Sequence, residues 1–315
     1  MFKIWISLLF ILLLSFAINN TINAGITAED WNRHGPWTEA LLAGKPIPLS
    51  VYPPAFHIFM APFVWLFGDQ IAWMQIVLAA LVNFTLLFIV HKYHGQTATL
   101  VMAILMLSNL CFLIYYDSLT PQTLDIILFP IFMHLLITKR YALAILPLVF
   151  IGYSHQFGFV FLVAATIYSL VYKREFIKFL MVAYILLIPM IYFQFVPFVM
   201  QVLFDQSAIR AIIPNSGMVN VDYQMFATAE TLYFEQPLNL LAFTGFTLPL
   251  ALYTIYRLFK DRKTYKLSDS QKFYIIWAIC FIPALYFSIW RGMSYEVVPL
   301  MLLTASLFTN RENRL

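Results

Sequence analysis

Long runs of apolar residues, separated by short polar stretches, follow one another along almost the whole chain. A helix needs roughly 20 apolar residues to cross the hydrocarbon core of a bilayer, and most of the runs approach or exceed that length. The clearest runs are Phe2–Ile22, Ile71–Val90, Ala98–Tyr115, Leu119–Ile137, Ile177–Phe204, Leu238–Phe259, Phe273–Trp290 and Ser294–Thr309. The pattern predicts an all-α polytopic membrane protein. Pro189 and Pro197 predict a kink in their run, because proline removes a backbone donor and clashes with the preceding turn.

Two further stretches do not fit a single span. Tyr141–Tyr172 is too long for one crossing, and Gly152-Tyr153-Ser154-His155-Gln156 interrupts it near its middle, so we interpret it as two short crossings. Ala55–Phe67 lies between Pro53-Pro54 and Gly68, and its 13 residues reach only about 20 Å as a helix. Because the hydrocarbon core is about 30 Å thick, we expect Ala55–Phe67 to be a helix packed at the outer interface or a re-entrant helix.

The composition agrees with this pattern. Hydrophobic residues make up 62% of the 315 residues and charged residues 11%, against about 25% charged residues in ordinary soluble domains. These values exclude a soluble globular protein, a disordered chain and a disulfide scaffold. The two cysteines, Cys111 and Cys280, lie inside apolar runs and are expected to be free packed thiols. We expect residues 1–315 to form a single transmembrane domain.

The positions of Lys and Arg predict how the spans are oriented. Ten crossings with both termini in the cytoplasm place 15 of the 19 basic residues inside and 4 outside, which is the bias expected of membrane proteins. The four outer residues are Arg33, Lys45, Arg210 and Arg291. This sorting explains the net charge of +4 without a nucleic-acid partner.

Two alternatives preserve the same bias. If the N-terminus were outside and Ala55–Phe67 crossed the membrane, only Lys3, Arg33 and Lys45 would change sides. The short length of Ala55–Phe67 and the position of Lys3 ahead of an apolar run argue against this arrangement. In the other alternative Met1–Ala24 is a cleaved signal peptide, which leaves the loop that follows it outside.

The outer side collects the polar residues on which chemistry can depend. It comprises the first external loop, residues 24–70, and a long external loop, residues 205–237. Three turns complete it, and they carry Asp117, His155 and Arg291. An active site is therefore expected at the extracytoplasmic face of the cell membrane.

The first external loop is the most informative part of the chain. Glu29-Asp30 precedes Arg33-His34, and Asp30, Arg33 and His34 would share one face if this stretch is helical. Gly35-Pro36 then predicts the start of a short juxtamembrane helix with proline at its first position, and Gly44 predicts its end.

The loop resembles that of the integral-membrane glycosyltransferases of the type C fold (GT-C), which include oligosaccharyltransferase catalytic subunits, protein O-mannosyltransferases and aminoarabinose transferases. The resemblance covers roughly residues 1–200 and rests on the pattern Glu29-Asp30…His34…Gly44…Tyr52-Pro53-Pro54…His57…Gly68. A second acidic motif of the family, in the external loop between the third and fourth spans, corresponds to Asp117. The chain resembles a small form of the family without a soluble domain.

The resemblance implies an inverting transferase whose donor is a sugar carried on a polyprenyl or dolichyl phosphate, with an acceptor that the sequence does not specify. Asp30 would orient or deprotonate the acceptor hydroxyl, with Glu29 and Asp117 beside it in the catalytic set. Asp30 and Asp117 would hold Mg²⁺ or Mn²⁺ through oxygen ligands. The residues expected to contact the substrates are His34, Arg33, Tyr52, His57, His155, Arg291 and Lys45. Arg291 suits the donor phosphate best, because a guanidinium group binds phosphate oxygens in pairs.

Two other hypotheses remain open. A transporter or lipid flippase would place charged residues along a path at the membrane midplane, and Asp125 is the charged residue well inside a span. A non-catalytic GT-C-like subunit would bind the lipid-linked sugar or stabilise a partner.

Overall fold

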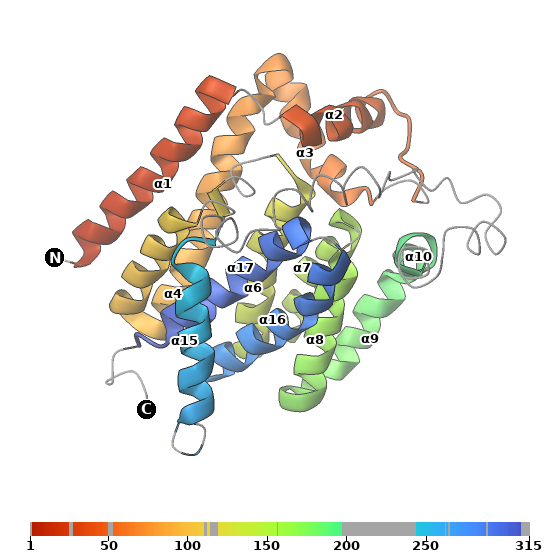
Figure 1. The fold of residues 1–315 in the computed structure, drawn as a ribbon. Helices are drawn as coiled ribbons and strands as arrows, with labels where there is room; N and C mark the ends of the chain where they lie inside the picture. The colour runs from red at the N-terminus through yellow and green to blue at the C-terminus, as the bar shows by residue number, and fades with distance from the viewer. Residues whose placement is uncertain are drawn as a thin grey trace. The chain divides into compact units, whose positions relative to one another are not determined.

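The structure is a computed structural model in which the chain forms two compact units (Figure 1). Unit 1 consists of Met1–Ile26, Gln75–Ser118 and Met225–Leu315, and unit 2 of Thr27–Met74 and Leu119–Gln224. The backbone is described for residues 2–24, 28–49, 53–109, 112–113, 119–155, 157–196, 244–261, 263, 265–287 and 289–309. All regular secondary structure in these ranges is helical, which confirms the all-α prediction for this part of the chain.

Unit 2 is built around α7, which packs against α3, α6, α8 and α9, while α2 packs against α3. Figure 1 shows α2 lying beside α3, and α8 beside α9. The elements of this unit are α2 (Ala28–Leu42), α3 (Ala55–Phe67), η1 (Gly68–Ala72), α6 (Pro121–Ile137), α7 (Tyr141–Ser154), α8 (Gly158–Tyr172), η2 (Arg174–Phe176), α9 (Ile177–Leu186), α10 (Ile188–Met190) and η3 (Ile191–Phe195).

Aromatic side chains form the core of unit 2. Phe129 and Phe132 of α6 are fully buried, and the Phe129 ring meets Phe161 of α8 edge to face with 4.6 Å between centroids. Phe132 continues the cluster to Phe176 of η2, at 5.7 Å. Edge-to-face and offset pairs are the favoured aromatic geometries, so these four rings fix the positions of α6, α8 and η2 within the unit.

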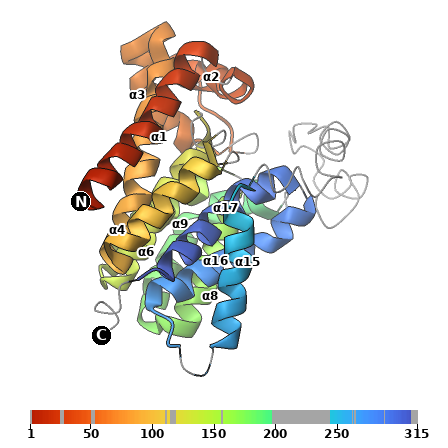
Figure 2. The same cartoon turned by 60° about the vertical axis from the view of Figure 1, so that its left-hand side comes forward.

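Unit 1 contains α1 (Phe2–Ala24), the part of α4 (Trp73–Ser108) from Gln75 onward, α15 (Thr247–Lys260), α16 (Asp269–Phe287) and α17 (Ile289–Ser306). The last helix, α17, packs against both α15 and α16 (Figure 2).

The polar residues 91–97, which the sequence places between two apolar runs, lie inside α4. Non-helical backbone at Gly95, with φ 84° and ψ −174°, divides α4 into two helical halves. Glycine adopts a positive φ without the steric cost other residues pay.

The juxtamembrane helix of the first external loop differs from the prediction at its start. A single helix, α2, runs from Ala28 to Leu42 and contains Pro36, so Gly35-Pro36 does not begin a new helix. Proline in a helix costs one backbone hydrogen bond, and here the helix continues through that loss. The predicted end is confirmed. Gly44 has φ +75°, and the Lys45 amide donates to the Ala40 carbonyl at 2.9 Å, which closes the last turn.

Two predicted interruptions are confirmed. The stretch Tyr141–Tyr172 forms two helices, α7 and α8, which separate at His155. The run with Pro189 bends by 59° where α9 ends and α10 begins, because Pro189 removes a backbone donor there. Pro197 lies outside the described residues.

Helix lengths do not support ten membrane spans. Among the described residues only α4 is long and apolar enough to cross a membrane by length and composition. The bent pair Arg174–Leu186 and Ile188–Phe195 adds a second candidate if it forms one span. The helices α6, α7 and α8 have 17, 14 and 15 residues, or about 21–26 Å at 1.5 Å per residue. They are apolar but shorter than the hydrocarbon core.

Candidate functional site

A buried hydrogen-bonded network joins α2 to α3 in unit 2. The Thr38 hydroxyl donates to the His34 carbonyl at 3.0 Å and lies 3.1 Å from Nδ1 of His57. The His34 and His57 ring centroids are 5.1 Å apart, and Phe56 packs edge-on against both rings. All four side chains are buried. The network therefore holds the juxtamembrane helix against the helix that follows the Pro-Pro pair.

Burial changes the acid–base properties of His57. Desolvation lowers the pKa of His57 to about 4, and a hydrogen bond with the backbone of His34 opposes part of this shift. The ring is therefore neutral near pH 7. If the Thr38 proton is directed to the His34 carbonyl, Nδ1 of His57 must be the donor to Thr38, which selects one tautomer of the neutral ring.

The helix α2 places residue 30 in register with this network. Residues 30, 34 and 38 are four apart, so in a continuous helix they lie on one face, one turn from each other. The helical conformation on which the shared face of Asp30, Arg33 and His34 depends is thus confirmed. The side chains of Glu29, Asp30 and Arg33 lie outside the described part, so their catalytic and binding roles stay predictions.

A second buried network joins α6 to the end of α7. Asp125 is fully buried, and its Oδ1 is hydrogen-bonded to the Ser154 hydroxyl. The same hydroxyl lies 2.9 Å from the Ile151 carbonyl. Because a hydroxyl has one proton to donate, either Ser154 donates to Asp125 or the carboxyl group itself carries a proton. The other oxygen, Oδ2, has no hydrogen-bond partner among the described residues.

His155 follows Ser154 in the sequence and lies beside α6 in the fold. Its Nε2 is 3.4 Å from Nε2 of Gln122, which lies one turn before Asp125 on α6. His155 is 5% exposed, and its ring stacks on Phe157 with centroids 5.6 Å apart. The structure thus brings His155 into the same buried cluster as Asp125. The helix α3, which carries His57, packs against α7, which ends at this cluster.

The remaining predicted site residues are not part of these networks as described. Tyr52, Asp117 and the long loop 205–237 lie outside the described residues, and Arg291 has a helical backbone in α17 but an undescribed side chain. Lys45 is exposed just beyond the C-terminal end of α2. At 1.5 Å per residue this end is about 20 Å from residue 30, which separates Lys45 from the Asp30 end of the helix.

The described side chains contain no group of three metal-ligating residues. Because the side chains of Asp30 and Asp117 are not among them, the predicted Mg²⁺ or Mn²⁺ site stays a prediction. A second buried carboxyl group occurs in unit 1, where Glu296 of α17 is 5% exposed and its Oε2 has no partner within the described ranges.

Sequence reasoning missed three polar residues that organise the structure. Thr38 lies at the centre of the α2–α3 network, with α-helical spacing from His34 as its only sequence signal. His94 of unit 1 joins Ser270 and Thr309, each at 3.1 Å. Asn109 donates to the Thr244 carbonyl and to the Thr247 hydroxyl, at 3.0 and 2.9 Å.

Apart from Glu296, the buried polar groups of the described residues that carry candidate chemistry lie in unit 2, on α2, α3, α6 and the end of α7. Their interpretation depends on their own chemistry and on the motif pattern of the first external loop. No family model matches the chain, and no curated protein is similar to it in sequence.

Proposed function

We propose that the protein is a multi-pass membrane glycosyltransferase of the GT-C type, which moves a sugar from a polyprenyl-phosphate-linked donor to an acceptor hydroxyl at the extracytoplasmic face. One observation carries the proposal. A continuous α2 places residue 30 one turn from His34, on the face that is fastened to α3 through Thr38 and His57. An acidic residue at the start of a helix fixed in this way is suited to meet a substrate at the membrane surface.

The exposed surface supports a membrane environment. Large apolar side chains are exposed on helices of both units, for example Trp65 at 75% and Phe259 at 69%. Soluble monomers rarely expose contiguous apolar patches of this kind. The proposed membrane protein has ten crossings, and its shorter helices would cross with the help of flanking residues or local thinning of the bilayer.

The proposed reaction is a single displacement at the anomeric carbon. The acceptor oxygen forms a bond to this carbon while the bond to the phosphate oxygen breaks, and the polyprenyl phosphate leaves with the electron pair. The acceptor proton passes to the carboxylate of Asp30, which acts as general base. Attack from the face opposite the phosphate inverts the configuration of the sugar. The charge that develops on the phosphate oxygens requires a cation, and Arg291 stays the expectation from the sequence for this role.

We propose that the Asp125 cluster of unit 2 also takes part in substrate binding. A buried carboxyl group with one unused oxygen can bind a sugar hydroxyl, because hydroxyls both donate and accept. Gln122 has an amide oxygen, Oε1, that also has no partner in the described part of the chain. Asp125 and Gln122 are therefore proposed as sugar-binding residues, with His155 beside them.

The test is Asp30→Asn in the full chain, purified and reconstituted in vesicles. The substrates are a panel of undecaprenyl-phosphate sugars with membrane glycolipid extract as acceptor, and the readout is release of undecaprenyl phosphate. We expect the variant to lose at least about 100-fold in rate, in the range found when a general base is removed.

The matched control is Glu39→Gln, which makes the same carboxyl-to-amide change on the exposed face of the same helix. This control should retain wild-type rates. Equal turnover by Asp30→Asn and the wild type would refute Asp30 as the base.

A transporter is the second candidate, and the unused Oδ2 of Asp125 favours it, because ionisable groups inside predicted spans often mark transport paths. Movement of labelled polyprenyl-phosphate sugar between vesicle leaflets, without release of undecaprenyl phosphate, would select this alternative. In that case Asp125→Asn should stop movement while Asp30→Asn should not.

A further inference from the structure

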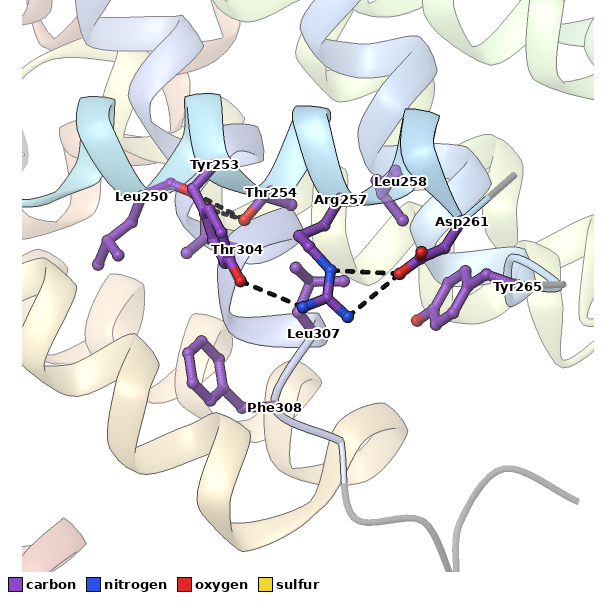
Figure 3. Close-up of a pocket in the computed structure, with 10 residues that line it drawn as sticks. All are labelled: Leu250, Tyr253, Thr254, Arg257, Leu258, Asp261, Tyr265, Thr304, Leu307 and Phe308. Atoms are coloured by element: carbon purple, nitrogen blue, oxygen red, sulfur yellow. Dashed lines mark hydrogen bonds and ion pairs between the residues drawn. The ribbon is translucent and has the colours of Figure 1, made fainter. Parts of the chain in front are cut away.

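A pocket of about 430 Å³ lies within unit 1, between α15 and the end of α17 (Figure 3). Its walls combine apolar side chains, including Leu250, Leu307 and Phe308, with the polar groups of Tyr253, Arg257 and Asp261. None of these residues belongs to the proposed transfer site. A pocket with apolar walls and a cation suits a ligand that has both an anionic group and hydrocarbon.

The cation of the pocket is Arg257, which lies between Tyr253 and Asp261 (Figure 3). Its Nη1 donates to the Tyr253 hydroxyl at 3.2 Å, and its Nε and Nη2 reach Oδ2 of Asp261 at 3.2 and 3.1 Å. A guanidinium group has five N–H donors, so two of them have no partner among the described residues. The Arg257 side chain is 49% exposed, which leaves these donors accessible.

The helix α15 presents an apolar surface beside the pocket. Leu252, Ile255, Tyr256 and Phe259 are exposed at helical spacing and form a stripe along α15. The pocket residues Tyr253 and Phe308 are exposed as well, at 51% and 43%. Such a stripe is typical of a helix that faces lipid, with aromatic rings near the headgroups.

Basic residues follow this stripe directly. Lys260, Lys263 and Lys266 are all exposed, and they lie at and just after the C-terminal end of α15. In the orientation proposed above this end faces the cytoplasm, where anionic lipids attract basic clusters near helix ends. Arg257 brings a positive charge to the pocket. Its ion pair with Asp261 partly offsets this charge, and Asp261 and Tyr253 together occupy three of its five N–H donors, which leaves two for a ligand.

We propose that this pocket binds the phosphate headgroup of an anionic phospholipid from the cytoplasmic leaflet. Two free N–H groups of Arg257 donate to the phosphate oxygens, the exposed lysines add long-range attraction, and the acyl chains lie along the apolar stripe of α15. The inference depends on the membrane orientation in the proposed function but not on glycosyl transfer. Loss of lipid binding and loss of transfer are therefore separate results.

The test is a binding titration of the full chain in a non-ionic detergent with dioctanoyl phosphatidylglycerol, followed by native mass spectrometry. We expect one saturable site, and Arg257→Gln should weaken it by about tenfold or more, because charge-assisted paired hydrogen bonds to phosphate are strong. Lys260→Gln is the matched control, since it removes the same charge from an exposed position outside the pocket. It should weaken binding by no more than about threefold.

Two further ligands test whether the site needs both the anionic phosphate and the acyl chains of the lipid. Dioctanoyl phosphatidylcholine, which has the same chains and no net charge, should bind at least about tenfold more weakly. Glycerol 3-phosphate, which has the phosphate without acyl chains, should not bind at the concentrations that saturate the lipid site. Equal binding of phosphatidylcholine, equal binding of glycerol 3-phosphate, or equal effects of the two substitutions would each overturn the proposal. If Arg257→Gln does not fold, the ligand series on the wild-type chain gives the same decision.

Discussion

Two buried histidines, one in each unit, illustrate what identifies a site in this protein. His94 of unit 1 uses both ring nitrogens, bonding Thr309 through Nδ1 and Ser270 through Nε2. It thereby ties α4, next to its break at Gly95, to the start of α16 and the segment after α17. His57 of unit 2 is equally buried and bonds the Thr38 hydroxyl, but it fastens the helix that carries Asp30.

Burial and a hydroxyl partner are thus common to both histidines. These two features therefore do not distinguish a structural histidine from a functional one. The two units differ in the other buried polar groups that they contain. The described network around His94 consists of hydroxyl and amide groups that bond one another, such as Gln271 with Ser306 at 3.0 Å. Each unit contains a buried carboxyl group with an oxygen that has no partner among the described residues, Glu296 in unit 1 and Asp125 in unit 2. Asp125 differs in lying one helical turn from Gln122, whose amide reaches His155. Unused hydrogen-bonding capacity in a buried site is costly unless something binds there.

The largest expected effect tests the structural role of unit 1. Gly245 has φ +53°, and a Cβ at this position would collide with the Ser108 carbonyl oxygen. We expect Gly245→Ala to lower the unfolding free energy by at least about 3 kcal/mol, because backbone must move and a positive φ is strained for alanine. Thermal unfolding in detergent measures this loss.

Gly152→Ala, in unit 2, is the comparison for Gly245→Ala. Its Cβ would lie 2.5 Å from Cδ2 of Leu187, a side-chain atom that can move. The expected cost is about 1 kcal/mol or less, since alanine also favours the helix. Equal losses in the two variants would contradict the backbone argument.

The next effect tests the functional role of unit 2. Asp125→Asn preserves the shape of the side chain and an acceptor for Ser154, so the melting temperature should change little. Transfer should fall by about 100-fold, or about 2.7 kcal/mol in the activation free energy. A decrease in rate that matches the fraction of unfolded protein would show that Asp125 is only structural.

His94→Ala should show the opposite behaviour. The substitution removes one hydrogen bond from Ser270 and one from Thr309, which keep their bonds to Ser268 and Ser306. We expect a loss of about 2 kcal/mol in unfolding free energy, or about 1 kcal/mol for each bond. The rate per folded molecule should remain that of the wild type. His91→Ala, an exposed position on the same helix, is the control and should change neither quantity. Loss of transfer by folded His94→Ala would remove the distinction between the two histidines.

The smallest effect at neutral pH is that of His57, which appears only when the pH is lowered. Its folded pKa of about 4 is below the unfolded value of 6.5, so above pH 6.5 the ring is neutral in both states and contributes no change. As the pH falls from 6.5 to 4, the unfolded chain binds a proton that the folded chain does not, and stability decreases by up to about 3 kcal/mol at pH 4. Unfolding of the wild type and His57→Phe between pH 7 and pH 4 should therefore diverge, with the variant losing less. Parallel curves would contradict this assignment.

Local sequence signals were sufficient for much of the fold. The helix Ala55–Phe67 has the predicted bounds, because Pro53-Pro54 and Gly68 limit it on both sides. Gly44 ends α2 and Pro189 bends its run, as predicted, since a positive φ and a missing amide are properties of single residues. The prediction failed at Pro36, where α2 continues through a proline. Ten spans stay a proposal, because several apolar runs of suitable length form helices too short to cross a bilayer unaided.

The sequence by itself determined that the chain is strongly apolar and, in its described part, helical, while the sorting of its charges between two sides of a membrane stays a prediction. Only the tertiary structure decided which polar groups meet. His94 reaches partners 176 and 215 residues away, and Asp125 finds Ser154 across 29 residues. Periodicity reports the face of a helix on which a residue lies, but not the helix that packs against that face. The choice of partner depends on how side chains fill space across the unit, and this is settled only when the helices pack.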